Sequence, residues 1–163
     1  MWRGKFLDAE STWDDRFTPL APPLGESVVT LQTGPAVALL KNLEQSWPTD
    51  GLKMRGYRLS KDGIPTLLYS QGTTKITDNL TPRGKGLRRQ MEFTGAKENL
   101  WVRLATAKVF FSDKPGVWST NTKLSITAPN SQIRRIEGMS ELIMPVKFDS
   151  SGKATMEIEW HWQ

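Results

Sequence analysis

Cysteine is absent from the 163-residue chain, and His161 is its only histidine. Without cysteine the chain has no disulfides, no thiol nucleophile and no thiolate metal site. A single histidine excludes metal sites that need paired imidazoles. The longest apolar run, Ala36 to Leu40, is far shorter than the roughly 20 residues of a membrane-spanning helix. We therefore expect no membrane insertion.

The two ends of the chain look like interior sequence. No basic-then-apolar signal peptide follows Met1. The last residues, Trp160 to Gln163, break off within a strand-like pattern. We therefore expect residues 1–163 to be one domain from a longer chain. The hydrophobic fraction of 37% and charged fraction of 24% predict a folded domain with a core. The net charge of +5 fits either an anionic partner or an ordinary solvated surface.

The residues that are present indicate strands. Glycine and proline recur about every ten residues, which is typical of an all-β sandwich or barrel. The clearest hairpin joins Met54–Ser60 to Ile64–Ser70 through Lys61-Asp62-Gly63, where Gly63 supplies a positive φ. Further strands are expected at Thr73–Thr77, Leu87–Phe93, Leu100–Leu104, Leu124–Ile126 and Leu142–Phe148.

The last strand has the most regular alternation. Met156, Ile158, Trp160 and Trp162 share one face, opposite Glu157, Glu159 and His161, which predicts a central strand. Arg89 interrupts the apolar face of its own strand, so it lies at a sheet edge or pairs with a carboxylate. Residues 35–45 fit either one short helix or a buried strand through Val37–Leu40. The predicted fold is an antiparallel β-sandwich of the jelly-roll or supersandwich type, with a closed barrel as the alternative.

Catalytic groups do not form a convincing set. His161 shares a strand face with Glu157 and Glu159, a pattern that an ordinary solvated face explains. The densest acidic cluster is Asp8, Glu10, Asp14 and Asp15. A glycoside-processing enzyme would need two such carboxylates about a sugar, but a loop capped by its own aspartates is the commoner origin. We expect a non-catalytic protein without a cofactor.

Tryptophan suggests a binding role, because exposed rings stack on sugars. Four rings do not all fall on apolar strand faces, and they form the predicted aromatic platform: Trp13, Trp47, Trp101 and Trp118. Burial in a second core layer is the competing interpretation.

Basic residues are concentrated in one short stretch, Arg83 to Arg89. Neither a following helix nor interleaved aromatic residues accompany it, so we expect no nucleic-acid binding. A solvated hairpin end is the ordinary explanation of this charge, and the alternative is that Arg83, Lys85, Arg88 and Arg89 dock a partner.

Three segments together resemble a known family. They are Trp2 to Ala9, continuing through Trp13 and Arg16-Phe17; Arg55 to Tyr69; and Gly84 to Arg89. They resemble a β-rich domain of large exported planctomycete-type proteins, whose chains also carry c-type cytochrome segments or propellers related to quinone-dependent sugar dehydrogenases. The resemblance covers roughly residues 1–110, and the Arg55–Thr66 hairpin is its most specific part.

The resemblance implies a periplasmic or extracellular location and a setting of redox or sugar chemistry. The haem attachment signature of those relatives, Cys-x-x-Cys-His, has no counterpart here, and no catalytic residue carries over. The expected function is thus a non-catalytic module of an exported multidomain protein that docks to sibling domains or binds carbohydrate. The alternatives are a glycoside-processing enzyme and a docking surface for a cytochrome.

Overall fold

The computed structural model describes residues 2–3, 26–27, 34–95, 99–121 and 124–162. These ranges contain strands and no helix, as predicted for an all-β protein. They accordingly contain no helix that could cross a membrane. The strands are β1 (Trp2–Arg3), β2 (Glu26–Ser27), β3 (Val37–Leu39), β4 (Leu52–Leu59), β5 (Pro65–Gln71), β6 (Thr74–Pro82), β7 (Gly86–Thr94), β8 (Leu100–Ala107), β9 (Phe111–Lys114), β10 (Val117–Ser119), β11 (Leu124–Thr127), β12 (Gln132–Ile136), β13 (Met139–Pro145) and β14 (Lys153–Trp162).

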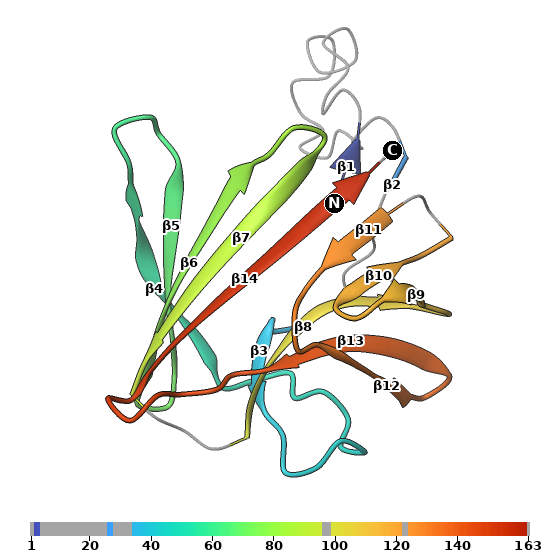
Figure 1. The fold of residues 1–163 in the computed structure, drawn as a ribbon. Coiled ribbons are helices and arrows are strands. Elements are labelled where there is room, and N and C mark those ends of the chain that lie inside the picture. The colour runs from blue at the N-terminus through green and yellow to red at the C-terminus, as the bar shows by residue number, and fades with distance from the viewer. Residues whose placement is uncertain (1, 4–25, 28–33, 96–98, 122–123, 163) are drawn as a thin grey trace, which may run out of the picture.

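Two antiparallel sheets form the body of the sandwich (Figure 1). The large sheet has eight strands in the order β4-β5-β6-β7-β14-β11-β10-β9, and the small sheet has four in the order β12-β13-β8-β3. The short strands β1 and β2 pair with each other. Both main sheets have free edges among the described strands, so the alternative of a closed barrel is wrong.

The core lies between the inner faces of the two sheets. The large sheet contributes Phe93 and Ile158, and the small sheet contributes Val102 and Leu142, all of which are fully buried. The alternation of β14 has the predicted result, because its apolar side chains enter this core while its glutamates face outward. β14 pairs with β7 on one side and β11 on the other, which confirms its central position.

Three sequence interpretations can now be decided. The hairpin between β4 and β5 forms as predicted, with Gly63 at φ 77° in its turn. Residues 37–39 form strand β3 on the edge of the small sheet, so the helix considered for residues 35–45 is wrong. Arg89 pairs with a carboxylate, since its Nε and Nη2 donate to Asp78 at 2.8 and 2.6 Å.

Candidate functional site

The hairpin of β4 and β5 carries the most exposed apolar side chains of the large sheet. Met54, Tyr57 and Leu59 on β4 are 51%, 62% and 61% exposed. The hairpin stands on the side of the molecule away from β12 and β13 (Figure 1). Single exposed apolar residues are ordinary, but a contiguous group marks an interaction surface. We call these three side chains the hairpin surface.

The register explains why these side chains are apolar. Tyr57 lies opposite Leu67, and Met54 lies opposite Tyr69, which in turn lies opposite the buried Ile76. Directly paired residues share one face of a sheet, so the hairpin surface continues the face that forms the core. β4 and β5 form one end of the eight-stranded order, and their inner face extends past the described strands of the four-stranded sheet (Figure 1). The hairpin surface is therefore core-type surface left open to solvent.

Basic side chains accompany the hairpin surface along the edge of the sheet. Lys53, Arg55, Arg58 and Lys61 are exposed on β4 and its turn, with the acidic residues Asp50 and Asp62 at the two ends of this segment. Arg55 occupies an irregularity in the β4–β5 register, and its Nε donates to Ser70 Oγ at 2.8 Å. The next residue, Gly56, has φ 126°, a backbone conformation that other residues rarely adopt. The free edge of β4 is thus positively charged and is bent at its middle.

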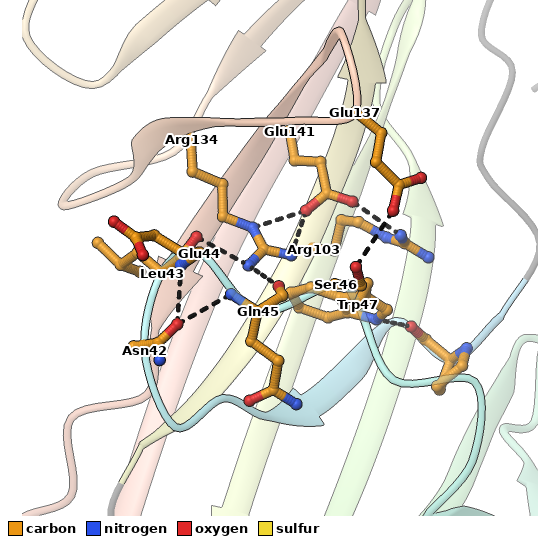
Figure 2. Close-up of polar contacts among 11 residues, drawn as sticks. Asn42, Leu43, Glu44, Gln45, Ser46, Trp47, Arg103, Arg134, Glu137 and Glu141 are labelled. Carbon is orange, nitrogen blue, oxygen red and sulfur yellow. Dashed lines mark hydrogen bonds and ion pairs between the residues drawn. The ribbon is translucent and has the colours of Figure 1, made fainter.

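The loop that leads from β3 to β4 is fastened to the outer face of the small sheet. Arg134 of β12 donates from Nη1 to the carbonyl oxygens of Leu43 and Gln45 at 3.2 and 2.6 Å (Figure 2). Its Nε donates to Glu141 Oε2 at 2.7 Å, and Glu141 Oε1 accepts from Arg103 at 3.1 Å. All three charged side chains are almost fully buried.

Trp47 completes this fastening. Its indole N–H donates to the carbonyl oxygen of Pro35 at 2.7 Å, and the guanidinium carbons of Arg103 and Arg134 lie 4.8 and 5.4 Å from its ring centroid. The ring packs in a small second cluster with Ile143 and the half-buried Trp101. Cation–π contacts and hydrogen bonds thus fix the loop before β4, which holds the base of the hairpin in place.

The outer face of the large sheet offers a second surface. A groove of about 860 Å³ runs over it, and a row of hydrogen-bonding side chains crosses four neighbouring strand pairs in register. That row is Arg58, Thr66, Asn79, Gln90 and Glu157. Asn79 Nδ2 donates to Thr66 Oγ1 at 3.0 Å, so part of this row is already internally paired. The described lining of the groove contains no aromatic ring.

The predicted aromatic platform is scattered in the structure. Trp47 and Trp101 lie together over the small sheet, where Trp47 is buried beneath the two arginines. Trp118 lies on β10, half-buried against the main core, with its indole N–H donating to Ser131 Oγ at 2.7 Å. Trp13 falls outside the described residues. Sugar binding by these rings stays a prediction, and the described ones do not form one exposed surface.

The predicted basic docking residues divide between the two faces of the large sheet. Arg83 and Arg88 lie on the outer face and form ion pairs with Glu159 and Glu157, while Lys85 is exposed in the turn. Arg89 points to the inner face, toward Asp78. The Arg88 guanidinium holds the pKa of Glu157 below its usual range. Partner docking by these residues stays a prediction, and Arg89 does not share the surface of the others.

The remaining candidates carry no assembled chemistry. His161 Nε2 lies 3.2 Å from Glu159 Oε2 at the end of β14. The acidic cluster Asp8, Glu10, Asp14 and Asp15 lies outside the described residues. Within the described ranges no three histidine or carboxylate side chains gather as metal ligands would.

Sequence reasoning found the hairpin but missed its exposed surface. Its alternating apolar residues fit a half-buried strand equally well, and only the width of the covering sheet decides which is the case. The signal that could have indicated exposure is the density of basic residues between the apolar ones, from Lys53 to Lys61. The chain matches no protein-family model, and no curated protein or solved structure shows significant similarity to it.

Proposed function

We propose that the protein is a non-catalytic β-sandwich module of an exported multidomain protein, and that it docks to a sibling domain through the hairpin surface. The observation that carries this proposal is the exposure of Met54, Tyr57 and Leu59 on a face of the sheet that elsewhere forms the core. Interfaces bury such apolar and aromatic side chains at their centres.

The anchoring of the hairpin supports the same role. A docking element should be held rigidly, because less conformational entropy is then lost on binding. The Arg134–Glu141–Arg103 network and Trp47 fix the loop before β4. The turn at residues 60–63 adds backbone hydrogen bonds between Ser60 and both Gly63 and Ile64. Apolar side chains that are exposed on the hairpin do not contribute to the core, so their presence favours docking over folding as their role.

Hydroxyl-radical footprinting tests the proposal without knowledge of the partner surface. Met54 and Tyr57 both react with hydroxyl radicals, and in isolated residues 1–163 they should be oxidised readily. In the full-length exported polypeptide we expect both to be protected at least about fivefold, because docking removes solvent from them.

Phe111 on β9 is the internal control, since it is also half-exposed and lies at the opposite edge of the large sheet. Its oxidation should be similar in the two samples. Equal oxidation of Met54 and Tyr57 in the isolated domain and in the full-length polypeptide would refute docking through the hairpin surface.

Carbohydrate binding is the second candidate, and the polar row in the outer groove favours it. Side chains such as Asn79, Gln90 and Glu157 present donors and acceptors at regular strand spacing, which suits the hydroxyl groups of a glycan. Without an aromatic ring in the described lining, hydrogen bonds would supply the affinity. Titration with neutral oligosaccharides should shift the amide NMR signals of these residues, and Gln90→Ala should abolish the shifts. Unchanged spectra with a broad glycan panel would remove this candidate.

A further inference from the structure

We infer that the free edge of β4 binds an extended segment of the sibling domain, in which apolar and acidic residues alternate, by adding it as a further strand. This inference rests on the proposed docking role and specifies the chemistry of the docked segment. The added strand pairs with Gly56–Leu59, beyond the irregularity at Arg55.

The edge supplies the backbone groups for such pairing. Among the described strands β4 is bonded to β5 on one side only, because it ends the eight-stranded order. An edge strand presents unpaired N–H and C=O groups that template another strand. The register shift between Met54 and Gly56 bends β4 and divides its edge in two. The half formed by Gly56–Leu59 is regular and carries two of the three side chains of the hairpin surface.

The register also fixes the pattern of the partner. Tyr57 and Leu59 lie opposite Leu67 and Pro65, on the inner face, whereas Arg58 lies opposite Thr66, on the outer face. Side chains of an added strand alternate between the same two faces. Apolar residues of the partner would therefore pack on Tyr57 and Leu59, and the residue between them would meet Arg58.

Charge selects an acidic residue for that middle position. Arg58 is exposed, and Lys53, Arg55 and Lys61 add positive charge along the same edge. A carboxylate on the added strand would face this charge, while a lysine would be repelled. A second copy of this chain would bring its own basic edge against the first. Neither nucleic acid nor a lipid surface has a peptide backbone that could pair with the N–H and C=O groups of this edge.

Two synthetic peptides test the inference on isotope-labelled protein. One has eight residues that alternate valine with glutamate, and the other alternates valine with lysine. The glutamate peptide should produce saturable shifts in the amide NMR signals of Gly56–Leu59, and its affinity should fall as salt concentration rises. The lysine peptide should produce none.

Charge reversal provides the decisive variant. Arg58→Glu should weaken binding of the glutamate peptide by at least about tenfold and create binding of the lysine peptide. The matched control is Arg135→Glu, which makes the same change at an exposed position of β12 and should leave glutamate-peptide binding unchanged. Dispersed amide spectra of both variants would show that they fold.

Four results would overturn strand addition: no shifts at Gly56–Leu59, equal shifts with both peptides, concentration-dependent broadening of these signals without peptide, or binding to phosphatidylglycerol vesicles in place of peptide. The third result would identify a second copy as the occupant, and the fourth an anionic membrane surface. Footprint protection of Met54 without peptide binding would refute the strand but leave the docking role intact. Peptide binding without protection of Met54 in the full-length polypeptide would refute the docking role but leave strand addition at the β4 edge intact.

Discussion

At the scale of single residues, the Asp78–Arg89 pair shows how a charge can be kept inside this sandwich. The Asp78 side chain is 2% exposed, and both of its oxygens accept from Arg89. Two parallel hydrogen bonds satisfy the carboxylate and fix the guanidinium. Arg89, which interrupts the apolar face of β7, is thus paired with a carboxylate on β6.

Replacing Arg89 by Met tests this pair. The variant keeps an apolar stem but leaves the Asp78 carboxylate buried and unpaired, so we expect a loss of about 3–5 kcal/mol in unfolding free energy. Urea denaturation measures the loss. The control is Arg83→Met, whose pair with Glu159 is exposed on the arginine side and should contribute less than about 1 kcal/mol. Equal losses in the two variants would contradict the burial argument.

Asp149 gives the protein one source of acid sensitivity. Its carboxylate accepts from the backbone N–H of Lys153 and from Ser151, and these hydrogen bonds lower its pKa from the ordinary 3.8. A lowered folded-state pKa contributes stability that is present above the unfolded pKa and is lost as pH falls through the folded one.

We therefore expect Asp149→Asn to be less stable than the wild type at neutral pH. The difference should shrink progressively below about pH 4, where both side chains become neutral. Thermal denaturation across this pH range measures the change. A difference that stays constant down to the acid limit would show that the Asp149 charge plays no part.

At the scale of elements, the approach of β7 to β14 depends on one glycine. A Cβ atom at Gly86 would lie 2.1 Å from the backbone oxygen of Trp160. Strand separation would have to increase at the end of the pairing that holds the centre of the large sheet. We expect Gly86→Ala to destabilise the fold by about 3 kcal/mol or more.

Gly84→Ala is the matched control in the same turn. Gly84 has φ 56°, but a Cβ there would meet no heavy atom within 4 Å. Only the cost of a left-handed backbone remains, about 1–2 kcal/mol. Denaturation curves should separate the two variants, and similar midpoints would show that the contact with Trp160 is easily relieved.

The elements differ in how far sequence could predict them. β14 and the β4–β5 hairpin follow from alternation and from Gly63 in the turn, which are local signals. β12 was missed because its one buried side chain is Arg134, on the outer face of the small sheet, and burial of that arginine depends on Glu141 and on carbonyl oxygens of a distant loop. β9 was missed because all four of its residues are exposed, so buried and exposed side chains do not alternate along it.

At the scale of the whole molecule, the unequal widths of the sheets create the candidate site. No local pattern reports how many strands cover a given face, so apolar alternation alone could not show that the hairpin surface is exposed. The basic residues between Lys53 and Lys61 were the one local sign of it. Nor does a local pattern report the burial of Trp47, which the sequence suggested as a sugar platform. Its burial requires Arg103 and Arg134 from two other strands.

The whole fold should tolerate loss of the hairpin surface. We expect the triple variant Met54→Ser, Tyr57→Ser, Leu59→Ser to unfold within about 1.5 kcal/mol of the wild type, because exposed substitutions each change stability by about 0.5 kcal/mol. Ile158→Ala, in the fully buried core, should cost about 2–5 kcal/mol. Urea denaturation compares them. A triple variant as unstable as Ile158→Ala would assign these side chains to folding and not to docking.

The central place of β14 has a consequence for biosynthesis. The block β4–β7 and the block β9–β11 are joined in one sheet only through residues 153–162. Residues 153–162 leave the ribosome after the other described strands of this domain. Until then the nascent chain has two unpaired strand edges that are prone to aggregation. A chain cut before Lys153 would keep every other described strand of the domain, yet its large sheet would fall into two half-sheets with no strand to join them.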